Sequence, residues 1–342
     1  MRVISCTSYY GTGSSAVTNF FSEFDNVFSL GEYEYRFLHD PDGIADLEYN
    51  VVENNNRHNT SDAIKRYIRF AATQKKLGYG GYDIFEDEFE KATEDFIDDI
   101  TELKAKTWWN KDRLDRGQLF CFIDRVYSFF KRLFKNELKT EIRYSLLTDR
   151  ELAYYSAVDE ETFLKAVRKY VDRLLSFANK NQLPYVMVDQ MVPPTNTKRF
   201  LRYFDDCKII ATERDPRDIF LLEKYEWKWG VLPVKDVKEY VEWFKITRKY
   251  SHPVDEDHSR VLRINFEDMI YKYDETKQIL CDFAGIDASH HVNPKTIFDP
   301  SRSIKNTNLV SRYPGCEEDI RYIESELKEY LYDFDAFAKN GG

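Results

Sequence analysis

The amino-acid sequence predicts an α/β fold in which a parallel sheet is flanked by helices and interrupted by a largely helical insertion. Three observations support this prediction. The first 30 or so residues follow the order strand, loop, helix, strand, and residues from about 61 to 180 form long amphipathic stretches with few Gly or Pro. Beyond the insertion, short apolar runs again alternate with helical patterns.

The N-terminal unit is defined by its apolar spacing. Residues 2–7 are predicted to form a strand, and the apolar residues of segment 15–24 recur at the spacing of one helical face. A second short strand is predicted at 27–30. A strand, a helix and a second strand in this order indicate parallel pairing, with the sheet buried on both faces.

After the insertion, predicted strands again alternate with predicted helices. The predicted strands are 185–189, 208–212 and 261–266, and the predicted helices are 195–204, 216–227, 274–284 (closed by Gly285) and 317 to about 332. No repeat or low-complexity linker divides the chain. We therefore expect a single α/β domain over residues 1–342, with the helical insertion at about 61–180.

Composition limits the classes of partner. The chain has 342 residues, with 50 basic and 60 acidic side chains and a net charge of −10, which disfavours nucleic acid or an anionic membrane as the main partner. No apolar run reaches the roughly 18 residues of a membrane-spanning helix. The N-terminus is polar and the five cysteines form no Cys-x-x-Cys pair, so we expect a cytoplasmic protein with reduced thiols and no transmembrane segment.

The loop after the first strand has the character of an anion-binding site. A junction of strand and helix directs backbone N–H groups and the positive end of the helix dipole at one point. Gly11 and Gly13 allow close approach of the backbone, and Thr12, Ser14 and Ser15 offer hydroxyl donors. An ordinary turn with a Ser N-cap is the alternative.

A second segment with anion-binding character follows the predicted strand 208–212. It places Arg214 at the carboxyl end of a strand, where ligands of open parallel sheets bind, and a guanidinium there can contact a phosphate through two N–H groups. Pro216 fixes the start of the next helix. The alternative is an exposed ion-pair cluster among residues 213–218.

Taken together, the two segments resemble the sulfotransferases that use 3′-phosphoadenosine 5′-phosphosulfate (PAPS), which have a P-loop-like α/β fold. The matching stretches are Thr12-Gly13-Ser14-Ser15, Arg214-Asp215-Pro216-Arg217-Asp218, Asn265-Phe266-Glu267-Asp268-Met269, residues 279–286 and Ser303-Ile304-Lys305-Asn306. The resemblance implies that the loop Gly11 to Ser15 binds the 5′-phosphosulfate and Arg214 the 3′-phosphate. It also implies that the segment with Ser303 and Lys305 closes over the nucleotide.

The chain departs from this family at two positions. Gly11 stands where relatives carry a Lys or Arg against the bridging oxygen of the sulfonate, and Leu222 stands where they carry a serine. Some other cation or set of N–H donors must then stabilise the leaving phosphate. Lys305, Arg302 and Arg57 are candidates.

The resemblance also implies a general base shortly after the second strand. Glu32 occupies that place, with Glu34 as substitute, and His39 is a further candidate for catalysis. We predict no metal site, because no His, Cys or acidic residues have the spacing of metal ligands. The predicted partners are the nucleotide donor and an acceptor hydroxyl, most simply on a carbohydrate or small alcohol.

Two other functions stay open on the sequence alone. A nucleotide-dependent small-molecule kinase would use the same kind of loop, but here no Lys precedes the hydroxyl pair Ser14-Ser15. A nucleotide-binding protein without catalytic activity is compatible with Gly11 and Leu222.

Overall fold

The computed structural model describes residues 1–78, 80–249 and 256–335. The chain divides into two compact units. The sheet unit comprises Met1–Leu38 and Leu175–Gly342, and the helical unit comprises His39–Leu174. No helix among the described residues is both long and apolar enough to cross a bilayer.

The sheet unit is built on five parallel strands in the order β2-β5-β1-β6-β7, which confirms the predicted α/β class. The strands are β1 (Arg2–Ser8), β2 (Val27–Glu34), β5 (Tyr185–Asp189), β6 (Cys207–Glu213) and β7 (Val261–Asn265). Ile4 in the central strand pairs with Met187 on one side and Lys208 on the other. All five carboxyl ends therefore lie at one edge of the sheet.

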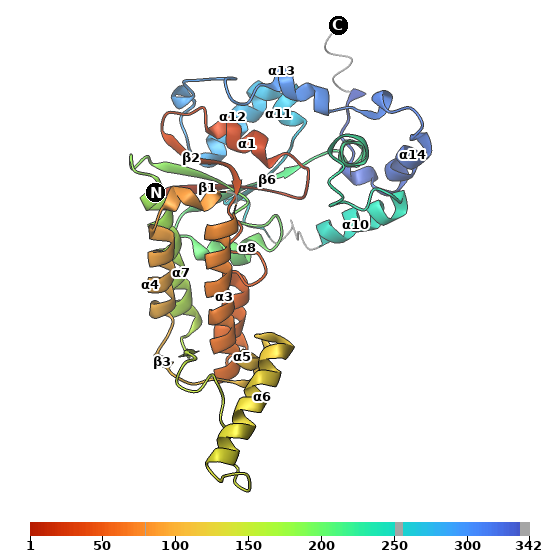
Figure 1. Cartoon of the computed structure of the whole chain (residues 1–342). Coiled ribbons are helices and arrows are strands. Elements are labelled where there is room, and N and C mark those ends of the chain that lie inside the picture. Colours follow the sequence, from red (N-terminus) through yellow and green to blue (C-terminus); the bar gives the residue numbers. More distant parts are fainter. Residues whose placement is uncertain (79, 250–255, 336–342) are drawn as a thin grey trace. The chain divides into compact units, whose positions relative to one another are not determined.

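Helices cover the sheet and supply its core. Figure 1 shows α1, α11 and α12 on one face, and their apolar side chains form one cluster with Ile4, Met187 and Ile210 of the strands. The helices of this unit are α1 (Ser14–Phe21), α8 (Thr197–Phe200), α9 (Pro216–Leu221), α10 (Val237–Lys249), α11 (Asp268–Tyr271), α12 (Tyr273–Ala284), α13 (Pro300–Ser303) and α14 (Glu317–Glu326).

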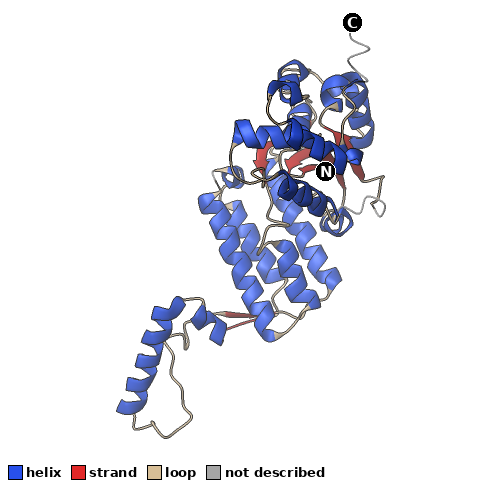
Figure 2. Cartoon of the chain, turned by 90° about the vertical axis from the view of Figure 1, so that its right-hand side faces the viewer, coloured by secondary structure: helices blue, strands red, loops and turns tan. Residues whose placement is uncertain are grey.

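The helical unit is dominated by helices that pack along their aromatic faces. Its elements are α2 (Ile44–Glu48), α3 (Arg57–Leu77), α4 (Glu88–Asp99), β3 (Leu103–Ala105), α5 (Asn110–Leu114), α6 (Gly117–Phe134), β4 (Ala153–Tyr155) and most of α7 (Glu160–Ala178). Phe96 of α4 contacts Tyr67 of α3 and stacks on Tyr170 of α7, with ring centroids 5.7 and 5.0 Å away. Figure 2 shows these helices as a bundle, with the β3–β4 pair at one end.

Most predicted boundaries agree with the structure to within a few residues, and Gly285 closes α12 in the left-handed region as expected. Three predicted helices are shorter. The segment predicted at 195–204 is α-helical only over α8, which begins after Asn196 with φ 54°. The helix predicted at 216–227 becomes a π-helix, a wider turn, from Leu222 to Trp227. The helix predicted from 317 to about 332 is α14, which ends at Glu326. The antiparallel pair β3–β4 was not predicted.

Candidate functional site

The first loop lies between β1 and α1 at the carboxyl edge of the sheet. Gly13 is the N-cap of α1 with φ 91°, a conformation that glycine adopts without strain. No side chain caps this helix start and its first turn has no acidic residue. The first N–H groups of α1, with buried Ser14 and half-buried Ser15, thus form a positive end suited to an anion.

Thr12 anchors this loop to the sheet. Its buried hydroxyl lies 2.7 Å from the carbonyl oxygen of Thr212 on β6 and 3.0 Å from that of Tyr9. Its main-chain N–H also donates to the carbonyl of Tyr9. Both donors of Thr12 are therefore engaged within the chain, and its contribution is to fix the path of the loop.

Arg214 joins the loop to two distant segments. The Arg214 Nη1 donates to the carbonyl oxygen of Gly11 at 3.1 Å, and Nη2 donates to the carbonyl of Asn306. The guanidinium carbon lies 4.6 Å from the ring centroid of Phe266, and only 5% of the residue is exposed. Three of the segments that the sequence singled out therefore meet at one buried cation.

Buried carboxyl groups shape the turn that carries Arg214. Asp215 caps α9, Asp218 accepts the N–H groups of Asn308 and Leu309 at 2.8 Å each, and Glu267 accepts the N–H of Asp215 at 2.9 Å. Burial raises the pKa of Asp218 to about 6 and that of Glu267 to about 8. The segment after Lys305 is thus held against α9 by Asp218 as well as by Arg214.

Ser303 and Lys305 lie on the short turn from α13 to Asn306. Ser303 is half-buried and Lys305 is exposed. Arg214 binds the carbonyl of Asn306, the residue after Lys305, so the end of this turn lies close to the first loop. Of the other cations considered, Arg302 is exposed beside Asp299, and Arg57 belongs to the helical unit.

The structure gives a physical reason for the missing basic residue at Gly11. This glycine has φ 75°, and a Cβ added to it would lie 2.8 Å from a ring carbon of Trp227. Trp227 reaches this place from the wider turn that follows α9. Leu222, at the start of the same turn, is buried in an apolar cluster.

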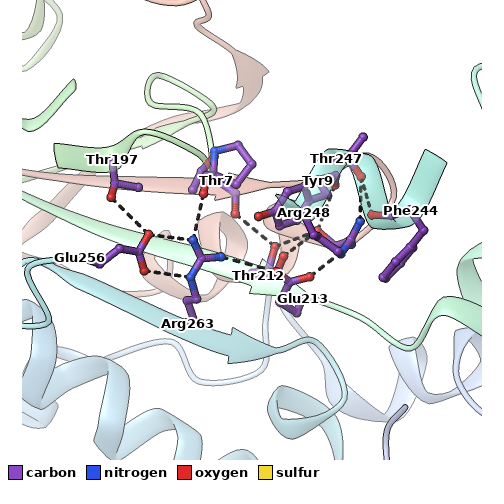
Figure 3. A network of polar contacts seen from close by, with 12 residues as sticks. Thr7, Tyr9, Thr197, Thr212, Glu213, Phe244, Thr247, Arg248, Glu256 and Arg263 are labelled. Atoms are coloured by element: carbon purple, nitrogen blue, oxygen red, sulfur yellow. Dashed lines mark hydrogen bonds and ion pairs between the residues drawn. The ribbon is translucent and has the colours of Figure 1, made fainter. Parts of the chain in front are cut away.

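A charged network supports the start of the loop from the side of β6 and β7 (Figure 3). Glu213 at the end of β6 contacts Arg248 at 3.2 Å and Arg263 at 3.4 Å, and Arg263 also pairs with Glu256 at 2.7 Å. The guanidinium of Arg248 lies 4.1 Å from the ring centroid of Tyr9. This buried network fixes Tyr9, the residue that accepts the hydrogen bonds of Thr12.

The second strand, β2, extends to Glu34, so Glu32 and Glu34 lie within the strand and not after it as expected, and both are exposed. Glu32 accepts a hydrogen bond from the Asn19 side chain of α1 at 2.6 Å, and Glu34 pairs with Arg36 at 3.1 Å. Glu32 is therefore directly connected to the helix that begins at the loop. His39 is half-buried in the turn before α2 and belongs to the helical unit.

Asp189 contacts the first loop, and its only signal in the sequence is that an acidic residue ends an apolar strand. It closes β5, is 2% exposed, and has one carboxyl oxygen 3.3 Å from the Ser14 hydroxyl and the other without a partner. Burial raises the pKa of Asp189 to about 8, and the charges of Glu34 and Glu32 also raise it. At neutral pH this carboxyl group therefore stays largely protonated beside the loop.

Within residues 1–78, 80–249 and 256–335, no group of three or more His, Cys, Asp or Glu side chains has the arrangement of a metal site. His291, for example, is held by Glu23 at 2.6 Å in the core of the sheet unit.

We predict that a side chain at Gly11 costs more stability than one at Gly31. The two glycines have similar φ values, 75° and 78°, but a Cβ at Gly31 would meet nothing within 4 Å. Gly31→Ala should lower the free energy of unfolding by about 1 kcal/mol through backbone strain. Gly11→Ala should lower it by about 2–3 kcal/mol, because the Trp227 contact adds overpacking.

Urea denaturation of the two variants measures this difference. Equal losses would show that Trp227 does not exclude a side chain from position 11. In that case the missing basic residue would need another explanation.

We also predict that Asp189→Asn makes the protein less sensitive to alkaline pH. An unfolded Asp loses its proton near pH ~4, whereas folded Asp189 keeps it to about pH 8. The folded state binds the extra proton between these values, so this group makes stability fall as pH rises from about 4 to 8. Asn cannot ionise and can retain the contact with Ser14.

The melting temperature of the variant relative to the wild type should therefore increase from about pH 5 to about pH 8. Glu267 and Asp218 titrate in both proteins and cancel in this comparison. A difference in melting temperature that is the same at both pH values would contradict a buried, protonated Asp189.

No protein-family model and no curated protein sequence matches this chain. Solved structures that resemble it include the sulfotransferase domain from the curacin biosynthetic pathway, at 13% identity over 97% of this chain and 99% of that chain, with a TM-score of 0.39. Another is the sulfotransferase domain from the Synechococcus PCC 7002 olefin synthase, at 12% identity over 97% and 95%, with a TM-score of 0.40.

Retinol dehydratase, solved in complex with androsterone and the inactive cofactor PAP, is 14% identical over 98% of this chain and 82% of that chain, with a TM-score of 0.32. These likenesses concern the fold alone. The roles of individual residues therefore rest on the contacts within this chain.

Proposed function

We propose that this protein transfers the sulfuryl group of PAPS to a hydroxyl group of an acceptor, and that the acceptor is a carbohydrate. The observation that carries the proposal is the contact of Arg214 with the carbonyl of Gly11 at 3.1 Å. It joins the segment expected to bind the 5′-phosphosulfate to the segment expected to bind the 3′-phosphate, although the two are about 200 residues apart in sequence.

The proposed donor site uses the groups at the carboxyl edge of the sheet. The uncapped N–H groups at the start of α1, with Ser14 and Ser15, would bind the 5′-phosphosulfate. Arg214, with Ser303 and Lys305 on the neighbouring turn, would bind the 3′-phosphate. A largely protonated Asp189 leaves the positive end of α1 uncompensated, which favours an anion there.

In the proposed reaction, the acceptor oxygen forms a bond to sulfur while the bond from sulfur to the bridging phosphate oxygen breaks. The acceptor proton passes to Glu32, and adenosine 3′,5′-bisphosphate leaves with the electron pair of the broken bond. Glu32 is supported as the base because its carboxylate is exposed and positioned by Asn19 of α1. The N–H donors of the loop and Arg214 would stabilise the charge on the leaving phosphate in place of the basic residue absent at Gly11.

A cavity within the helical unit has a lining that is suited to a sugar. It has a volume of about 190 Å³, and its lining includes Trp109, Tyr155, His58, Asp62 and Thr107. Trp109 stacks on His58 with ring centroids 3.7 Å apart. Aromatic faces next to carboxylate and hydroxyl groups are suited to the apolar face and the hydroxyls of a sugar ring.

A protein that binds the nucleotide without turnover is the second candidate. It is favoured by Gly11, where Trp227 blocks a basic side chain, and by Leu222, which is buried where relatives carry a serine. A kinase has no comparable support, because no Lys precedes Ser14 and Ser15.

The donor site is tested by ligand-dependent melting. Adenosine 3′,5′-bisphosphate should raise the melting temperature far more than 5′-AMP or Mg-ATP, since a ligand at about 100 times its Kd adds about 2.7 kcal/mol of stability. Arg214→Lys should weaken the bisphosphate by about tenfold or more, because one ammonium cannot replace the planar guanidinium. It should weaken 5′-AMP less, because 5′-AMP lacks the 3′-phosphate and is affected only through the contact of Arg214 with the Gly11 carbonyl. Arg217→Lys, in the same turn but paired with Asp215 and Glu324, is the matched control.

Glu32→Gln separates transfer from binding. This variant should bind the bisphosphate like the wild type but transfer the sulfuryl group from PAPS to oligosaccharides about 10²–10⁴ times more slowly. A selective bisphosphate response without any transfer by the wild type would favour the protein without turnover. A response to Mg-ATP alone would overturn the sulfotransferase proposal.

A further inference from the structure

Helix α6 of the helical unit exposes a continuous apolar face. Leu119 near its start is 73% exposed and Phe134 at its end is 83% exposed. Between them the apolar side chains recur at helical spacing, so they share one side of the helix. The face includes Phe122, Ile123, Val126, Phe129, Phe130 and Leu133. An exposed apolar surface of this extent marks an interaction site.

The opposite side of α6 packs against its own unit, so the apolar face points away from that unit. Asp124 is 2% exposed and accepts hydrogen bonds from the Ser145 hydroxyl at 2.9 Å and the Leu146 N–H at 2.7 Å. Tyr144 donates its N–H to Ser128 one turn further along. Both views show α6, yellow in Figure 1, extending beyond the ends of α3 and α4 within the helical unit.

The charge around α6 is opposite in sign to that of the whole chain. Residues 113–143 contain eight basic and four acidic side chains, a net charge of +4, whereas the chain carries −10. Arg125 and Lys135 are exposed on α6 and just beyond its end, and Lys131 lies 5.2 Å from the ring centroid of Tyr127. Aromatic and basic side chains thus flank the apolar face.

We propose that α6 binds to the surface of an anionic lipid bilayer, with its phenylalanine face in the interfacial region and its basic side chains on the headgroups. A strongly amphipathic helix with Phe and Leu on one face and Lys and Arg around it has this behaviour. Pairing of α6 with a second copy would bring two segments of +4 together, whereas anionic headgroups neutralise that charge. This surface is independent of the donor site.

Vesicle sedimentation with the full chain tests the proposal. Vesicles of phosphatidylcholine with roughly 30% phosphatidylglycerol should bind the protein at least about tenfold more strongly than phosphatidylcholine alone in about 0.05 M salt, and about 0.5 M salt should abolish the preference. Phe129→Glu combined with Phe130→Glu should weaken binding by about a hundredfold or more. Both residues are exposed, so the variant should keep the circular dichroism spectrum of the wild type.

Two matched variants serve as controls. Leu77→Glu changes an apolar side chain of the same unit that is 65% exposed but lies at the end of α3, and it should leave binding unchanged. Arg125→Glu should weaken binding to the anionic vesicles, whereas Lys91→Glu on exposed α4 surface should affect it much less.

Three outcomes would overturn the proposal. The first is that the wild type sediments with neither kind of vesicle. The second is that the double Phe variant binds vesicles as well as the wild type does. The third is that light scattering without lipid shows a dimer of the wild type that binds no vesicles and that the double Phe substitution dissociates. The last outcome would assign the apolar face to a second copy of the chain.

Discussion

The donor site depends on one interaction, the binding of the Gly11 and Asn306 carbonyls by the buried guanidinium of Arg214. A buried Arg requires hydrogen-bond acceptors, and here these come from two main-chain segments far apart in sequence. Phe266 and Trp227 complete its surroundings, at 4.6 and 5.9 Å from the guanidinium carbon. The same two aromatic side chains lie where a Cβ at Gly13 or Gly11 would have to fit. Loop shape and cation position are therefore consequences of one packing arrangement.

The charges of the acidic side chains near Arg214 and the first loop are also affected by burial. Several acidic side chains lie where the strands of the sheet end, which is also where an anion is expected to bind. Burial raises the pKa of Asp189 and Glu267 to about 8. These groups accept main-chain or hydroxyl hydrogen bonds, and near neutral pH they add little negative charge. The site can thus use acidic side chains for structure and still present N–H groups and Arg214 to a phosphate.

The sequence was sufficient to predict those features that depend only on neighbouring residues. Parallel strands, the helix closed by Gly285 and the loop before α1 follow from apolar spacing and from Gly and Pro. The β3–β4 pair was missed because each strand has three residues and its partner lies about 50 residues away. The inward direction of the Thr12 hydroxyl and the raised pKa of Asp189 depend on burial by distant segments. The exposure of α6 could not be predicted either, because an amphipathic pattern ordinarily indicates a buried face.

The most direct test of the account is a backbone amide spectrum of the ¹⁵N-labelled chain titrated with adenosine 3′,5′-bisphosphate. If Arg214 joins the three segments into one donor site, the amides of Gly13, Ser14 and Ser15 should shift together with those of Arg214 and residues 303–306. With 5′-AMP the loop amides should shift while those near Arg214 change little. Binding of the bisphosphate that leaves the loop amides unchanged, or that shifts only one of these segments, would contradict the account.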